Sequence, residues 1–146
     1  GRCGACYAFA VAGSVEGACC KKHKFFQKIS EQQIVTCSSN NDYGNYGCNG
    51  GKISSSFLYI LDEGSMDNIS YPYVSTDTEK CAHDTTKVVT RISNYVIDEE
   101  QLKDVLAAKG PLVVAINASS KLFQFYKSGC FFDALCSKSV NHAMVS

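Results

Sequence analysis

The chain has 146 residues, of which 45% are apolar and 19% are charged, and its 14 basic and 14 acidic side chains balance to a formal net charge of zero. This balance removes the basic excess expected of a protein that binds nucleic acid or an anionic membrane. No apolar run approaches the roughly 18 residues that a membrane span needs, and the eight Phe, eight Tyr and two Pro are typical of a folded domain rather than a disordered chain.

The first half of the chain contains three predicted helices. Residues 6–23 form the first, because small and apolar side chains recur at spacings of three and four, at Ala8, Val11, Val15, Ala18 and Cys19. Ser30 is predicted to cap a second, short helix, with the Gln33 side chain reaching back to it in a capping box. Residues 38–51 predict a polar loop. The third helix follows from an apolar stripe that ends at Gly64, made of Ile53, Phe57, Ile60 and Leu61.

The remaining residues turn toward β-structure. Residues 88–96 alternate loosely like a strand. Asp98 is predicted to cap a short helix that carries Leu102, Val105 and Leu106 and stops at Gly110. Residues 112–116 and 140–145 are typical of strands. A mostly helical part followed by a β-rich part predicts an α+β fold.

Cysteine content indicates the compartment. Nine cysteines in a chain of this length are more natural in an oxidising compartment, where disulfides persist. Because nine is odd, at least one thiol is free or pairs outside the chain. The chain begins at Gly1 without a Met or a signal peptide and stops at Ser146, at the end of a predicted strand; we therefore expect a partial sequence.

Cys3 and Cys6 lie at the start of the first predicted helix, and three interpretations are open. The Cys6 thiol would face unpaired amide groups at the positive end of the helix dipole, which favours the nucleophilic thiolate. Two structural cysteines, one in a disulfide and one buried, are an equal alternative. A redox dithiol of the thioredoxin type is the third, and it predicts a disulfide between Cys3 and Cys6.

A nucleophilic cysteine needs an imidazole partner, and His142 is the best candidate, although a lone His in an apolar strand is more often a core residue. His23 lies in a Lys cluster, and His83 lies in a polar loop. A zinc site is disfavoured, because two adjacent cysteines on a helix diverge by about 100°. Its ligands would come from Cys3, Cys6, Cys19, Cys20 and His23.

Five motifs follow one another along the whole chain. The first is Cys3-Gly4-Ala5-Cys6-Tyr7-Ala8-Phe9, and His142 follows Cys6 by 136 positions, inside the spacing of about 130–150 that accompanies this segment in one enzyme family. The others are Ser30-Glu31-Gln32-Gln33 leading to Cys37, Gly47-Cys48-Asn49-Gly50-Gly51, and Tyr71-Pro72-Tyr73 leading to Cys81. With these motifs the chain resembles the papain-like cysteine peptidases. It is similar to their cathepsin L-like branch, because it has no insertion of the cathepsin B type between Gly51 and Tyr71.

The resemblance implies a two-lobed papain-like fold and an endopeptidase with no cofactor and no metal. Residues 1–92 would form the helical left lobe, complete or nearly so, and residues 93–146 the beginning of a truncated β-barrel right lobe. Cys6 would be the nucleophile and His142 its partner, with the Cys6 backbone N–H in the oxyanion hole. The family's Gln, directly before Gly1, and its Asn, after Ser146, are not in this chain. Because most of the β half is also missing, which would leave a sheet with a bare edge, we expect the fragment alone to be inactive. A catalytically impaired homologue that binds or stores is the alternative.

The resemblance also assigns the substrate groove. Gly50 and Gly51 would pair with the peptide backbone, and Gly4 and Asn141 would line the groove near the scissile bond. A pocket for the second residue before that bond would be formed by Lys52, Ile53, Ala115, Val140 and Ala143. Since four of these five side chains are apolar, a hydrophobic substrate residue is expected.

The remaining implications concern cysteines, partners and location. The resemblance implies disulfides Cys3–Cys48 and Cys37–Cys81, and a cysteine outside the chain as partner for Cys136. Cys19 is expected to be a small core residue, and whether Cys20 meets Cys130 stays open. Expected partners are protein or peptide substrates, a propeptide and cystatin-type inhibitors, with no nucleic acid and no membrane, in a lysosomal or secreted setting. Of the two glycosylation sequons, we expect Asn68 to be usable and Asn117 not.

Overall fold

The computed structural model describes residues 1–39, 42–78, 80–97 and 100–146. Three helices come first, α1 (Cys6–His23), α2 (Glu31–Cys37) and α3 (Ile53–Glu63), with a 3-10 turn, η1 (Gly47–Asn49), before α3. They are followed by β1 (Ser65–Met66), the 3-10 turn η2 (Thr85–Lys87), β2 (Val88–Thr90), α4 (Leu102–Lys109), β3 (Val113–Ile116), α5 (Lys121–Gln124) and β4 (His142–Val145). No helix in the described ranges is both long and apolar enough to cross a membrane.

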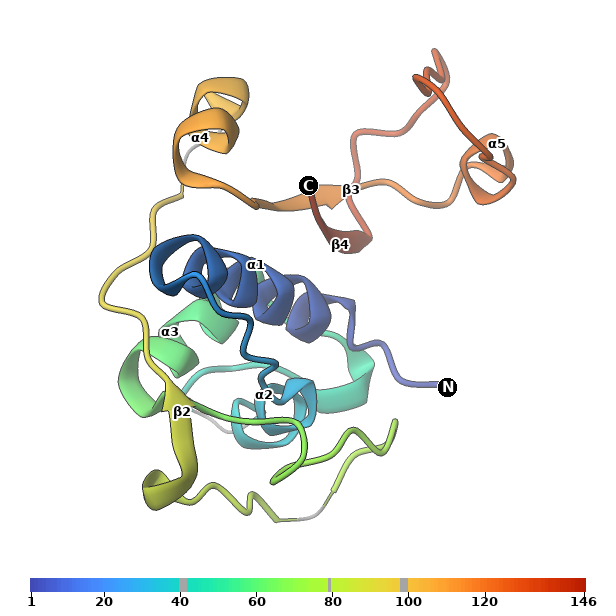
Figure 1. The fold of residues 1–146 in the computed structure, drawn as a ribbon. Helices are drawn as coiled ribbons and strands as arrows, with labels where there is room; N and C mark the ends of the chain where they lie inside the picture. Colours follow the sequence, from blue (N-terminus) through green and yellow to red (C-terminus); the bar gives the residue numbers. More distant parts are fainter. Residues whose placement is uncertain (40–41, 79, 98–99) are drawn as a thin grey trace.

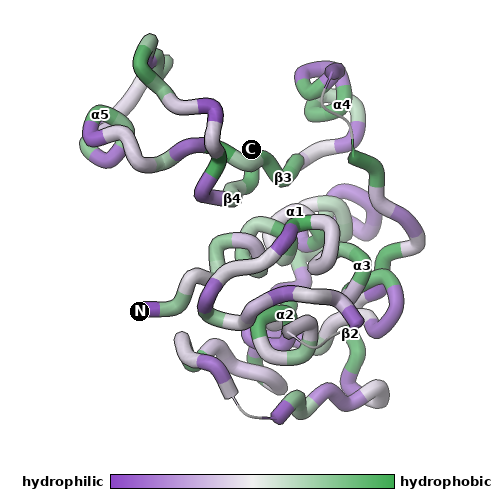
Figure 2. The backbone as a smooth tube through the Cα atoms, turned by 180° about the vertical axis from the view of Figure 1, so that it is seen from behind, coloured by the Kyte–Doolittle hydropathy of each residue, from purple (hydrophilic) through white to green (hydrophobic). Residues whose placement is uncertain are grey.

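The strands form two separate antiparallel pairs. In the β1–β2 pair, Ser65 lies opposite Thr90. The β3–β4 pair runs from Ile116 opposite His142 to Val113 opposite Val145. Figure 1 shows α1 in the middle of the molecule, with α2 and α3 on one side and β3–β4 on the other, and Figure 2 shows the same order from behind. Helix α1 is therefore the element that joins the two parts.

One face of α1 forms the core with α2 and α3. Its buried side chains recur at helical spacing, at Ala8, Val11, Ala12 and Val15. They pack with the buried apolar side chains of α2 and α3, which are Ile34, Val35, Tyr59 and Ile60. Burying one such large side chain contributes about 1.5–3 kcal/mol. Ala18, predicted to belong to this stripe, is exposed, because it is turned about 100° from Cys19, which is partly buried against the core.

Another face of α1 carries small residues, and the second part of the chain packs there. A Cβ added at Gly13 would lie 3.1 Å from Cγ2 of Val145, and one added at Gly17 would lie 2.6 Å from Cγ of Pro111. Between them, the Ser14 hydroxyl donates to the Pro111 carbonyl over 3.0 Å. The helix backbone can approach β4 and Pro111 only because these side chains are small.

Helix α2 begins as predicted, but the capping box is only half formed. The Ser30 Oγ accepts from the Gln33 backbone N–H over 3.0 Å. Gln33 does not reach back to Ser30, which corrects the prediction: its Nε2 donates to the Tyr59 hydroxyl over 2.8 Å, and its Oε1 accepts from the Met66 N–H over 2.7 Å. The Ser30 N–H donates to the Met66 carbonyl instead. The Met66 N–H thus replaces the Ser30 N–H as the donor to Gln33, and the Met66 carbonyl replaces Gln33 as the acceptor for the Ser30 N–H.

The other predicted elements are present with shifted ends. Helices α3 and α4 end before Gly64 and Gly110, at φ angles of 75° and 107° that favour glycine. The strand predicted over residues 88–96 stops at Thr90, because its partner β1 has only two residues. The strand predicted over residues 140–145 begins at His142. Helix α5 was not predicted, and the predicted cap Asp98 lies outside the described residues.

Both disulfides that the resemblance implies are present, Cys3–Cys48 and Cys37–Cys81. The first joins the segment before α1 to η1, and the second joins the end of α2 to the loop before η2. The five other cysteines are free thiols: Cys6, Cys19 and Cys20 are half-buried, and Cys130 and Cys136 are exposed. Cys20 and Cys130 are thus not bonded to each other.

Candidate active site

Cys6 is the first residue of α1 and carries a free, half-buried thiol. The preceding residue, Ala5, offers no side-chain cap, and the first turn contains no acidic residue. The Ala5 carbonyl accepts from the N–H groups of Ala8 and Phe9 over 2.9 and 3.1 Å. The thiol therefore lies beside amide groups of a first helical turn that has no anionic neighbour of its own.

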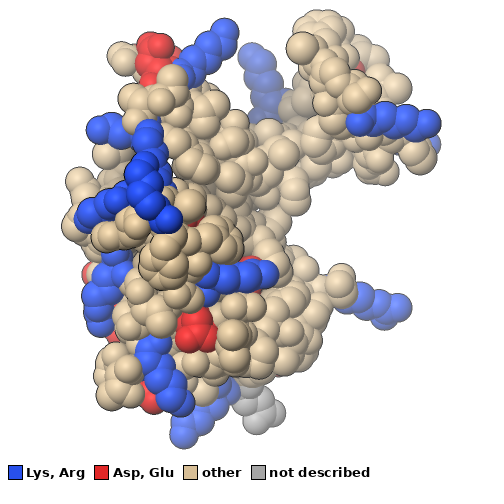
Figure 3. All heavy atoms as spheres, viewed as in Figure 1, with Lys and Arg blue, Asp and Glu red and all other residues tan. Residues whose placement is uncertain are grey.

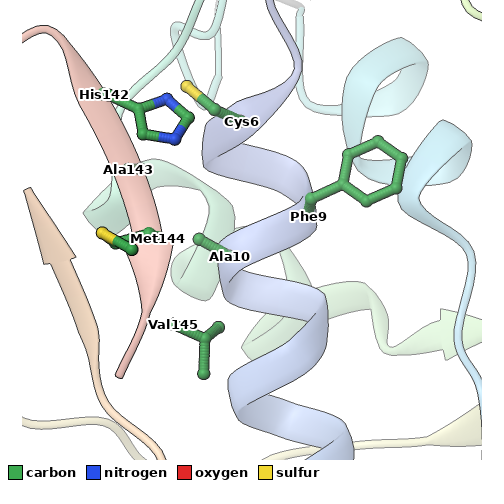
Figure 4. A pocket seen from close by; sticks show the side chains of 7 residues that line it. All are labelled: Cys6, Phe9, Ala10, His142, Ala143, Met144 and Val145. Carbon is green, nitrogen blue, oxygen red and sulfur yellow. The ribbon is translucent and has the colours of Figure 1, made fainter. Parts of the chain in front are cut away.

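His142 is the first residue of β4 and pairs with Ile116 of β3. It is exposed, although the apolar strand predicted over residues 140–145 suggested an apolar setting for it. The strand begins only at His142, and the preceding Val140 and Asn141 are also exposed. Figure 4 shows the Cys6 sulfur and the His142 ring pointing toward each other across the gap between α1 and β4. The packing of α1 on β4 thus brings together the two residues singled out from the sequence.

Two cavities share Cys6, His142 and Ala143 as wall residues. The first has a volume of about 370 Å³ and extends along α1 and β4, where Phe9, Ala10, Met144 and Val145 complete its lining. The second has a volume of about 320 Å³, and its further lining residues are Tyr7, Gly51, Lys52, Ile53, Ala115, Val140 and Asn141. Figure 3 shows the molecule hollowed between the part that carries α5 and the helical part below it.

Seven of the nine residues expected to bind substrate line the second cavity, and Gly4 and Gly50 do not. Gly4 lies against η1, where its N–H donates to the Cys48 carbonyl over 2.8 Å. The Gly50 carbonyl accepts from the Tyr46 N–H over 2.9 Å. The Asn141 side chain is turned to the segment after β3, where its Oδ1 accepts from the Ala118 N–H over 2.9 Å and its Nδ2 donates to the Ser119 hydroxyl.

Glycine is required at positions 50 and 51 for different reasons. A Cβ at Gly51 would lie 2.6 Å from Asn45 Oδ1 and 2.7 Å from Tyr7 Cε2, so buried side chains occupy that space from within. A Cβ at Gly50 would meet nothing within 4 Å, but Gly50 has a φ of 106° that side chains disfavour. The inward contact at Gly51 was not expected from the sequence, which suggested only close approach of a peptide.

Tyr7 connects the start of α1 to η1. It is 1% exposed, and its hydroxyl donates to the Gly47 carbonyl over 2.9 Å. Burial raises the pKa of Tyr7 well above its usual value, and the Asp77 carboxylate raises this pKa further, so the hydroxyl keeps its proton and remains a donor. Asp77 itself accepts from the Cys48 N–H over 2.6 Å. Both contacts fix the loop that leads to Gly50.

The lining residues missed from the sequence had a readable signal. Phe9 and Ala10 lie three and four residues after Cys6, which places them one helical turn away, and Met144 shares a strand face with His142. The Phe9 ring points away from β4 in Figure 4 and packs edge-on against Tyr73, with ring centroids 4.9 Å apart.

The other chemical interpretations of the sequence lose support here. Because Cys3 is bonded to Cys48 and Cys6 is free, the redox dithiol is wrong. No group of three His, Cys, Asp or Glu within the described residues could hold a metal ion. His83 lies outside both cavities, with its Nδ1 3.5 Å from Glu63 Oε2.

The family profile described as "Papain family cysteine protease" matches residues 1–146. The chain is 41% identical to "Cathepsin S" of Mus musculus and 40% identical to "Cathepsin L-like" of Caenorhabditis elegans, in each case over 99% of this chain and 44% of the relative. Among solved structures, "Structure of digestive procathepsin L 3 of Tenebrio molitor larval midgut" matches with a TM-score of 0.87 and 37% identity, over 99% of this chain and 48% of that chain. The chain thus spans less than half the length of the relatives it matches.

Proposed function

The chain belongs to the papain family of cysteine proteases, and from that premise we propose that it carries the nucleophile and the general acid–base of a cysteine-type endopeptidase. The observation that carries this proposal is that Cys6 and His142 line the same two cavities from opposite sides. One residue comes from the start of α1 and the other from the start of β4. A nucleophile facing an imidazole in an open cavity is the arrangement that acyl transfer needs.

The proposed reaction runs through a thioester. The Cys6 thiolate attacks the peptide carbonyl carbon and forms a C–S bond, while the Cys6 backbone N–H stabilises the oxyanion. The C–N bond then breaks as the His142 imidazolium donates its proton to the departing amine. Water attacks the thioester and gives a proton to His142, the C–S bond breaks, and the thiolate–imidazolium pair is restored.

Substitution in the intact protein tests the two roles. Cys6→Ala should reduce hydrolysis of a fluorogenic peptide to background, and His142→Ala should reduce it by about a hundredfold or more. Cys130→Ala is the matched control, because its thiol is also free but lies outside both cavities. Continued cleavage by Cys6→Ala would overturn the proposal. An unmodified protein that binds the peptide without cleaving it would favour the impaired, binding homologue.

A hydrophobic residue is the proposed preference for the second position before the scissile bond. The support is the second cavity, whose apolar lining residues are Ile53, Ala115, Val140 and Ala143. Lys52 also lines it but is exposed, so its amine can remain in solvent. A peptide with Leu at this position should be cleaved at least about tenfold faster than one with Glu, and Lys52→Met should change the Leu peptide by less than about twofold. Faster cleavage of the Glu peptide would contradict this preference.

The lobe boundary, the partners and the location are proposed on the same premise. Residues 1–92 and 93–146 would belong to different lobes, and cleavage by limited proteolysis between β2 and α4 would support this division. A propeptide and cystatin-type inhibitors are the proposed partners; the solved relative is described as a "procathepsin". A lysosomal or secreted location accords with the two disulfides, which persist in oxidising compartments, and microscopy of the tagged intact protein would test it.

A further inference from the structure

Asn45 is a buried polar residue that the proposed mechanism does not use. It precedes η1, is 2% exposed, and comes from the segment whose sequence indicated only a polar loop. Its Nδ2 donates to the hydroxyls of Ser38 and Ser56 over 2.8 and 3.1 Å. Its Oδ1 accepts from the Lys52 backbone N–H over 2.7 Å. Both donor hydrogens and one acceptor site are therefore satisfied, which fixes the orientation of the amide.

The Asn45 amide and its partner Ser56 hold the Lys52 backbone from two directions. The Asn45 Oδ1 accepts from the Lys52 N–H, and the Ser56 hydroxyl donates to the Lys52 carbonyl over 3.0 Å. Lys52 lies directly before α3, where no side chain caps the helix. The Asn45 side chain therefore fixes the backbone position of residues 50–52 from the buried side of this segment.

The segment is fixed at its other end by different contacts. Tyr7 binds the Gly47 carbonyl, Asp77 binds the Cys48 N–H, and the Tyr46 N–H binds the Gly50 carbonyl. Asn45 supplies the fixed point after the glycines, and its Oδ1 also occupies the space behind Gly51, 2.6 Å from where a Cβ would lie. Without Asn45, residues 50–52 would keep their first attachment and the contact of the Lys52 carbonyl with Ser56, but the Lys52 N–H would lose its acceptor.

We propose that Asn45 is a positioning residue: by holding the Lys52 N–H it keeps the edge of residues 50–52 in place for the backbone of a bound peptide. This inference rests on the proposed peptidase function and adds a residue to its substrate site. Asn45 lines neither cavity, so it acts through Lys52 and touches neither Cys6 nor His142.

The test compares two substrates of the intact protein. One is a fluorogenic peptide with a hydrophobic second residue before the scissile bond, and the other is an ester of a single amino acid, which has no such second residue. Asn45→Ala should raise KM for the peptide about tenfold, the effect of losing one well-formed hydrogen bond. Hydrolysis of the ester and alkylation of Cys6 by iodoacetamide should change by less than about twofold.

Two further variants separate positioning from a merely structural role. Ser56→Ala removes the hydroxyl that donates to the Lys52 carbonyl, so it should raise KM for the peptide without changing hydrolysis of the ester. Ser38→Ala removes another hydrogen bond of the Asn45 amide without touching Lys52 and should keep the original KM for the peptide. Ser38 is equally buried, which makes it the matched control.

Several results would overturn the proposal. Equal losses for the peptide and the ester in Asn45→Ala, or a tenfold rise of KM in Ser38→Ala, would assign Asn45 a general structural role. An unchanged KM for the peptide in Ser56→Ala would also overturn it, independently of whether Asn45→Ala folds. Failure of the proposed function is recognised separately, because Cys6→Ala would then cleave the peptide at the same rate as the unmodified protein does. That result overturns both proposals.

Discussion

Removal of each disulfide in turn should separate stability from activity. The two bonds close loops of nearly equal length, with sequence separations of 45 for Cys3–Cys48 and 44 for Cys37–Cys81. In the chain-entropy description, each loop contributes about 4 kcal/mol to the free energy of unfolding. The double variants Cys3→Ala/Cys48→Ala and Cys37→Ala/Cys81→Ala of the intact protein should therefore be destabilised by similar amounts.

The effect on activity should differ, because only one bond lies at the candidate site. Cys3 is three residues before Cys6, and Cys48 is two residues before Gly50. The Gly4 N–H also donates to the Cys48 carbonyl over 2.8 Å. This hydrogen bond and the disulfide together join the start of α1 to the segment that leads to Gly50. Cys37, at the end of α2, lines neither cavity.

Urea unfolding measures the loss of stability in each double variant. Peptide hydrolysis, at a temperature where both variants are folded, measures the loss of activity. We expect kcat/KM to fall about tenfold or more without Cys3–Cys48, because small displacements of reacting groups are costly, and to change less than about twofold without Cys37–Cys81. Equal losses of activity in the two variants would refute the reasoning.

Three smaller predictions follow. Gly51→Ala should lower the free energy of unfolding by about 1–3 kcal/mol, because its Cβ would meet the buried Tyr7 ring 2.7 Å away; unchanged urea unfolding would contradict this. Burial raises the pKa of Glu16 above its usual value of 4.5, so folding favours its protonated form and its contribution to stability is lost as pH rises through the folded pKa. Glu16→Gln should therefore weaken the loss of stability that occurs as pH rises above the usual pKa of 4.5, and identical urea curves against pH would refute this. Ser30→Ala removes the acceptor of the Gln33 N–H and should cost about 1 kcal/mol, measured by thermal unfolding.

The parts of the fold that could be predicted depend on local rules. The stripe at Ile53, Phe57 and Ile60 and the glycine at position 64 fixed α3 almost to the residue, because helical periodicity and a left-handed end are properties of a short segment. Gln33 was misassigned for the opposite reason. A capping box considers only neighbours in the sequence, whereas the Met66 N–H lies 33 residues away and is buried beside the Gln33 amide.

The candidate site divides in the same way. Cys6 was found from its place at a helix start, a local signal, whereas His142 was chosen by comparing its setting with those of His23 and His83, and the resemblance then supported it through its spacing from Cys6. Asn45 had no signal at all, since an asparagine among Ser, Asn and Gly predicts nothing but a loop. Its three hydrogen bonds exist only after α2, η1 and α3 have packed together.

The short separation between Cys6 and His142 depends on residues that take no part in the proposed reaction. The two lie at the starts of α1 and β4, and nothing in the local sequence joins these elements. What sets their separation is the contact of α1 with β4 and Pro111, where a Cβ at Gly13 would come within 3.1 Å of Val145 and one at Gly17 within 2.6 Å of Pro111. A larger side chain at Gly17 would force Pro111 or the helix to move, and one at Gly13 would crowd Val145 in the strand that begins at His142. The close packing at Gly13 and Gly17 therefore holds the strand that carries His142 against the helix that carries Cys6.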